Sequence, residues 1–135
     1  MNRKALLGDP PAIQVTNSDF GRLDMFLAKL SGKANTGALE FLRDELDRAR
    51  LVDEAEITAP FVRIGSRVLF GDERGKTYRL TLLFPGEKSS APSQLSIVTP
   101  VGVALLGLSE GQSISYETPD NRIKTVTVLK VSEGR

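Results

Sequence analysis

The hydrophobic period of this chain changes once, and that change constrains its fold more than any other feature. The first half spaces its large apolar residues by three or four positions, in two similar runs: Phe20, Leu23, Leu27 and Leu30, then Leu39, Leu42, Leu46 and Ala49. From Phe61 onward apolar and polar residues alternate, as in Tyr78, Leu80, Leu82 and Phe84. Spacings of three and four share a helix face, whereas a spacing of two shares a strand face. The sequence therefore predicts an α+β fold with helices first and sheet second.

The two helical runs predict a short antiparallel helical hairpin over residues 17–52. Each run forms one narrow apolar stripe, and residues 31–37 form the connecting loop. Asn17 or Ser18 can cap the first helix. Asp44 and Arg48 on the second helix are expected to form an i,i+4 ion pair.

Two segments flank this short coiled-coil arm. Residues 1–16 are expected to be an extended lead-in, because Pro10 and Pro11 block regular structure and Ile13 and Val15 permit only a short strand. Residues 53–60 are acidic and end at Pro60, which predicts a linker.

Residues 61–135 predict an antiparallel sheet packed around one short helix. A turn at residues 71–75 separates two alternating strands. Pro100 suits the first position of a brief apolar helix that Gly107 ends. The alternation shifts between Val128 and Leu129, which predicts a β-bulge.

The residue types present exclude several function classes. The chain has no cysteine and no histidine, so disulfides, thiolate or histidine metal sites and imidazole-based catalytic triads are excluded. Its 18 basic and 17 acidic residues give a net charge of +1, without the basic excess typical of proteins that grip duplex DNA. The apolar stretch at residues 5–7 is too short for a signal peptide or a membrane span. We expect a cytoplasmic protein with no cofactor, no strong nucleic-acid binding and no membrane association.

Two stretches suggest chemistry on first inspection. Residues 71–77 resemble a phosphate-binding loop, but they have one residue too few between the glycines and connect two strands, so we interpret them as a hairpin turn. Glu40, Asp44 and Asp47 share a helix stripe that could attract a metal, but Arg43 and Arg48 are expected to neutralise it. No metal site is predicted.

The stretch with the most specific pattern is residues 94–108, QLSIVTPVGVALLGL, followed by Gly111 and Pro119. It resembles the C-terminal domain of the Gre transcript-cleavage factors and, more closely, the Rnk family. Residues 45–49 (ELDRA) and 65–68 (GSRV) are also similar to Rnk. The resemblance spans roughly residues 11–132.

The resemblance implies a short coiled-coil arm followed by a Gre-type, FKBP-like β domain over residues 61–135. In Gre factors this domain grips the rim of the RNA polymerase secondary channel, while a long arm carries acidic tip residues to the catalytic metal. The Rnk arm is shorter and does not promote cleavage, and residues 31–37 contain no Asp or Glu. The implied role is a non-catalytic transcription regulator that binds RNA polymerase and competes with Gre factors, with Val98, Thr99, Pro100 and Gly102 at the contact.

The chain departs from the family pattern at three places. Gln112 stands where the family often has Asp, Asp120 and Asn121 replace a usual Gly-Gly turn, and Val98 replaces a polar or acidic residue.

Two alternatives of other classes remain open at this point. An FKBP-type prolyl isomerase or chaperone would need an aromatic-lined hollow, and the chain has no Trp, two Tyr and six Phe. An adaptor that uses the same surface on a different protein fits the sequence as well, because fold alone does not specify a partner.

Overall fold

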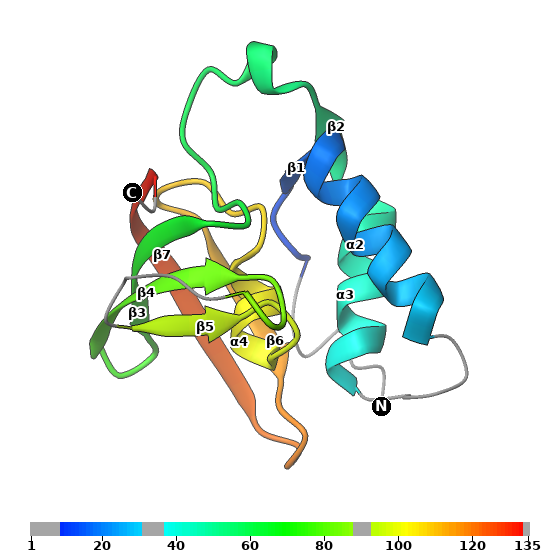
Figure 1. Cartoon of the computed structure of the whole chain (residues 1–135). Coiled ribbons are helices and arrows are strands. Elements are labelled where there is room, and N and C mark those ends of the chain that lie inside the picture. Colours follow the sequence, from blue (N-terminus) through cyan, green and yellow to red (C-terminus); the bar gives the residue numbers. More distant parts are fainter. Residues whose placement is uncertain (1–8, 31–36, 88–92, 134–135) are drawn as a thin grey trace.

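The computed structural model describes residues 9–30, 37–87 and 93–133 of the chain. In chain order the elements are β1 (Gln14–Thr16), α2 (Asn17–Leu30), α3 (Gly37–Arg48), β2 (Arg50–Val52), the 3₁₀ helix η1 (Glu54–Glu56), β3 (Ser66–Asp72), β4 (Thr77–Leu83), β5 (Gln94–Ser96), α4 (Pro100–Leu105), β6 (Ser113–Glu117) and β7 (Ile123–Glu133). Helices α2 and α3 lie side by side on one side of the molecule, and the larger sheet lies on the other (Figure 1). The predicted α+β class is confirmed.

The apolar stripes of α2 and α3 are buried. Leu23 and Leu27 of α2 and Leu42 and Leu46 of α3 belong to one hydrophobic cluster, which extends into the sheet. An ion pair between Arg43 Nη1 and Asp24 Oδ1, 2.8 Å apart, also links the two helices. The predicted connecting loop lies outside the described residues except for Gly37, which begins α3. The helices therefore pack against the β half as well as against each other.

Replacement of Leu27 by alanine is expected to lower the free energy of unfolding by about 2–3 kcal/mol. Truncating a buried leucine loses its transfer free energy and leaves a cavity, and Leu27 is only 7% exposed. Met25 on the same helix is 63% exposed, so Met25→Ala is the matched control and should change stability by less than about 0.5 kcal/mol. Urea unfolding of both variants measures the two changes in unfolding free energy. Equal losses of stability would show that burial of the apolar stripe does not stabilise α2.

The end of the predicted lead-in and the end of the predicted hairpin range pair with each other as a small sheet. Strands β1 and β2 pair in parallel, with Val15 opposite Leu51. Helix α3 ends at Arg48, and the next free amide, that of Arg50, donates to the carbonyl of Ile13 at 3.0 Å. The predicted hairpin range 17–52 was therefore wrong over its last three residues, because a strand partner far away in the sequence captures them. The acidic linker contains the 3₁₀ helix η1.

The larger sheet has the order β5-β4-β3-β7-β6. Strand β3 pairs antiparallel with β4 and β7, and β6 pairs antiparallel with β7. Strand β5, in contrast, pairs parallel with β4, with Leu95 opposite Leu82. The prediction of a wholly antiparallel sheet was wrong at this edge, because alternation in a three-residue strand specifies which side chains are buried and not the strand direction.

The predicted β-bulge is confirmed on β7. Leu69 pairs with Lys130 and the next residue, Phe70, pairs with Val128, so Leu129 has no partner on β3. The shift leaves Val128 and Val131 buried while Leu129 is exposed. The bulge therefore keeps both halves of a long strand facing the core.

Candidate docking corner

The four residues singled out by the resemblance lie together at the turn between β5 and α4, here called the β5–α4 corner (residues 96–102). Thr99 is the N-cap of α4, and its hydroxyl oxygen accepts from the Gly102 amide at 3.1 Å. The same hydroxyl donates to the carbonyl of Ser96 at 2.8 Å. Pro100 occupies the first turn of the helix, where its missing amide hydrogen costs nothing. The helix start predicted at Pro100 is confirmed.

Gly102 supports the corner from inside. A Cβ at this position would lie 2.2 Å from the carbonyl oxygen of Ser96 and 3.0 Å from the Thr99 hydroxyl oxygen. Gly102 is also buried, so it is not available to a partner. Because Gly102 has no side chain, the start of α4 can approach the end of β5 closely.

Val98, Thr99 and Pro100 are half-buried, so part of each side chain remains accessible. The Thr99 hydroxyl already makes two internal hydrogen bonds. The surface that the corner offers to a partner is therefore mainly the apolar parts of Val98 and Pro100.

A hollow of about 500 Å³ opens beside Pro100, between the arm and the β half. Its wall comes from α3, from Pro100 and from the turn that joins β6 to β7. In that wall the rings of Phe41 and Tyr116 stack with their centroids 6.2 Å apart. Burial, followed by the charge of Glu73, raises the pKa of Tyr116 to about 12, so its hydroxyl is neutral at ordinary pH. Because α3 and Pro100 line the same hollow, a partner that touches Pro100 would also lie next to the arm.

The charged side chains that line this hollow are all acidic: Glu40, Asp44 and Glu117. From the sequence, Arg43 and Arg48 were expected to neutralise the acidic stripe on α3, and this expectation was wrong. Arg43 pairs with Asp24 of α2, and Arg48 pairs with Glu45 rather than Asp44. Both arginines have nearer carboxylates on other faces of the helices.

A second hollow, of about 790 Å³, lies on the sheet. Three aromatic side chains line it, Phe70, Tyr78 and Tyr116, and the rings of Phe70 and Tyr78 stack at 5.3 Å. Five charged side chains also line it: Asp72, Glu73, Arg74, Arg122 and Lys124. Sequence reasoning did not find this aromatic group, because its members come from three strands and show no spacing pattern.

The stretch that resembles a phosphate-binding loop is the hairpin between β3 and β4. One oxygen of Asp72 accepts from the amides of Arg74 and Lys76, at 2.9 and 3.0 Å, and the other accepts from the Tyr78 hydroxyl. Burial acts to raise the pKa of Asp72, but these hydrogen bonds outweigh it and lower the pKa below its ordinary value. The loop amides that could bind a phosphate therefore already donate to the Asp72 carboxylate. Strands β3 and β4 pair antiparallel on either side of the loop, so the hairpin interpretation is confirmed.

Among the residues that the structure describes, no three Asp or Glu side chains converge closely enough to hold a metal ion. None of the described helices combines the length and the apolar character needed to cross a bilayer.

Comparison with known protein families divides the chain between residues 52 and 54, a few residues before the change in hydrophobic period at Phe61. The family described as "Transcription elongation factor, GreA/GreB, C-term" matches residues 54–133. The family described as "Rnk N-terminus" matches residues 11–52. The first match contains the β5–α4 corner and the second contains both helices of the arm.

Individual relatives agree with this assignment. The chain is 34% identical to the Regulator of nucleoside diphosphate kinase of Escherichia coli (strain K12), over 90% of this chain and 89% of that protein. It is 32% identical to transcription elongation factor GreA of Roseiflexus castenholzii, over 70% of this chain and 60% of that protein. The solved structure of a transcription elongation factor GreA/GreB from Nitrosomonas europaea superposes with a TM-score of 0.68 at 35% identity, covering 89% of this chain and 98% of that one. The resemblance noted from the sequence is confirmed, and the chain belongs to the family of Rnk and the GreA/GreB transcription elongation factors.

Proposed function

We propose that this protein is a non-catalytic regulator of transcription that docks on RNA polymerase near the secondary channel. The contact is made by Val98, Thr99 and Pro100 at the β5–α4 corner, with Gly102 holding the corner in shape. The protein then competes with Gre factors for the same place. It acts in the cytoplasm, where the polymerase is.

The observation that carries the proposal is the β5–α4 corner itself, within a half-chain that matches the GreA/GreB family. The corner is a rigid capped turn that leaves two apolar side chains, Val98 and Pro100, partly open. Such a pre-organised apolar patch binds a partner at low entropic cost. The hollow beside Pro100 places α3 next to the same surface, so one partner would contact both halves of the protein.

The arm supports a role without cleavage. Helix α2 has 14 residues and α3 has 12, which gives an arm of about 20 Å. The connecting residues 31–37 include no Asp or Glu, so the connection brings no carboxylate that could act on a catalytic metal. An arm of this kind would occupy the channel entrance without acting on the transcript.

The larger hollow makes a prolyl isomerase the less well supported alternative. An isomerase site would bind an apolar proline ring, but five charged side chains share this hollow with the three aromatic rings. Burying charges against an apolar ligand is costly unless they are paired. Polymerase docking therefore stands ahead of isomerase activity, and an adaptor acting on another protein is tested by the experiment below.

Direct binding to RNA polymerase core enzyme, measured by fluorescence anisotropy of the labelled protein, tests the proposal. The variant Pro100→Glu should bind at least tenfold more weakly, because a charge then sits in the apolar contact. A glutamate is compatible with the first turn of a helix, and Thr99 is left intact because its hydroxyl caps α4.

The matched control is Leu129→Glu, which makes the same kind of change at an exposed apolar residue on β7. It should bind as the wild type does. Equal affinities for Pro100→Glu and the wild type would exclude the corner from the contact. Absence of binding by the wild type would favour the adaptor alternative.

A further inference from the structure

Residues 11–14 run between the arm and the β half and bond alternately to each. The carbonyl of Pro11 accepts from Arg48 of α3 at 2.6 Å, and that of Ala12 accepts from Gln112 of the β half at 3.1 Å. The Ile13 carbonyl turns back to the Arg50 amide of β2 at 3.0 Å, and the Gln14 amide donates to the Gly107 carbonyl of the β half at 3.2 Å. Successive peptide groups of an extended chain face opposite directions, so one short segment can hold both halves.

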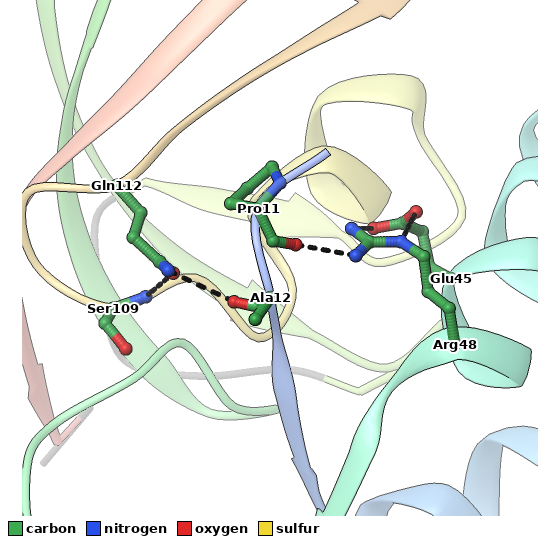
Figure 2. A network of polar contacts seen from close by, with 6 residues as sticks. All are labelled: Pro11, Ala12, Glu45, Arg48, Ser109 and Gln112. Atoms are coloured by element: carbon green, nitrogen blue, oxygen red, sulfur yellow. Dashed lines mark hydrogen bonds and ion pairs between the residues drawn. The ribbon is translucent and has the colours of Figure 1, made fainter. Parts of the chain in front are cut away.

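On the arm side, the donor to the Pro11 carbonyl is Arg48, which forms an ion pair with the buried Glu45 (Figure 2). Arg48 bonds both oxygens of Glu45, each at 2.8 Å, and the Glu45 side chain is only 5% exposed. A bidentate carboxylate fixes the plane of a guanidinium group. The remaining nitrogen of Arg48 is thereby aimed at the Pro11 carbonyl. Glu45 and Arg48 of the run 45–49 therefore form a fixed donor for the Pro11 carbonyl.

On the β side, Gln112 and Gly107 make the contacts with residues 11–14. The Gln112 side-chain oxygen accepts from the Ser109 amide at 2.9 Å, which orients its NH₂ group towards Ala12 (Figure 2). At Gly107, a Cβ would lie 2.8 Å from both the Ile13 Cβ and the Gln14 carbonyl oxygen. The segment therefore lies directly on the β-half backbone.

We infer that residues 11–14 are a two-sided strap that sets the angle of the helical arm relative to the β half. Glu45, Arg48 and Gln112 are its positioning residues. Other contacts between the arm and the β half, such as the edge-on pair of Phe26 and Phe84, lie along the helices. The strap instead contacts the arm at the C-terminal end of α3. This inference does not rest on polymerase docking, and its test uses the free protein.

The test measures the distance between the arm and the β half by double electron–electron resonance. Because the chain has no cysteine, spin labels can be placed uniquely with Met25→Cys on α2 and Lys130→Cys on β7, both of which are exposed. The wild-type background should give one narrow distance distribution. Gln112→Glu keeps the acceptor for Ser109 but replaces the donor to Ala12 by a second oxygen, so the distribution should become at least twice as wide. Gln94→Glu makes the same chemical change at the exposed first residue of β5; it is the control and should leave the width unchanged.

A second variant cuts the strap from the arm side. Glu45→Met with Arg48→Met removes the donor to Pro11 without leaving a buried charge, and it should also at least double the width. Its control is Arg43→Met, which removes an ion pair within the arm and should not broaden the distribution. Wild-type widths in both strap variants would overturn the inference, and so would equal broadening in the controls.

Discussion

Gly102→Ala is expected to lower the free energy of unfolding by about 2–5 kcal/mol. The new Cβ would lie 2.2 Å from the Ser96 carbonyl oxygen, which is backbone and cannot rotate away. Overpacking of this kind costs about 1–3 kcal/mol. The shift that relieves it pulls the Gly102 amide from the Thr99 hydroxyl, and losing an N-cap costs about 1–2 kcal/mol more. Chemical denaturation of the purified variant measures the sum.

Gly21→Ala is the control for this result, and it should change stability in the opposite direction. Gly21 lies on the exposed side of α2, and no atom comes within 4 Å of the position that its Cβ would take. Alanine favours a helix over glycine by roughly 0.5–1 kcal/mol, so this variant should be slightly more stable than the wild type. A Gly102→Ala protein as stable as the wild type would contradict the structure of the β5–α4 corner.

Arg48→Met is expected to lower the free energy of unfolding by about 3 kcal/mol. The substitution leaves the Glu45 carboxylate, 5% exposed, without its counter-ion. Breaking a buried ion pair by removing one partner typically costs about 3–5 kcal/mol. Arg48 itself is 27% exposed, so water offsets part of the loss and the lower end of that range applies.

The double variant Glu45→Met with Arg48→Met should recover most of this loss. Replacing both members of a buried pair by apolar residues of similar size is often neutral. The urea midpoints of the single and double variants provide the measurement, provided that their m-values, the slopes of unfolding free energy against urea concentration, are equal. A double variant no more stable than Arg48→Met would contradict this prediction, because the loss would then not come from the unpaired Glu45 carboxylate.

Much of the fold could be predicted from local patterns in the sequence. The spacing of the apolar residues predicted that Leu23, Leu27, Leu42 and Leu46 are buried. The shift in alternation after Val128 predicted the bulge, and Pro100 predicted the start of α4. Each of these features depends on residues within one or two turns or strands, where periodicity and steric preference decide the outcome.

The features that could not be predicted depend on partners distant in the sequence. Strand β2 forms because Ile13 lies beside Arg50, and a three-residue pattern does not reveal that neighbour. The parallel direction of β5 has the same origin. Arg48 was assigned to Asp44 by spacing alone, whereas burial of Glu45 next to the strap decides the pairing. For the candidate site, sequence similarity located the corner, but only the structure shows that Gly102 is buried while Val98, Thr99 and Pro100 remain partly open.

Competition with a Gre factor on backtracked RNA polymerase complexes directly tests whether the protein docks at the secondary channel without promoting cleavage. The protein alone should release no short 3′ fragments above the intrinsic rate of the polymerase. In the presence of GreA, increasing amounts of wild-type protein and of Leu129→Glu should inhibit the stimulated cleavage equally, whereas Pro100→Glu should need at least tenfold higher concentrations. Stimulation of cleavage by the protein itself, no inhibition by the wild type, or equal inhibition by Pro100→Glu would each contradict the account.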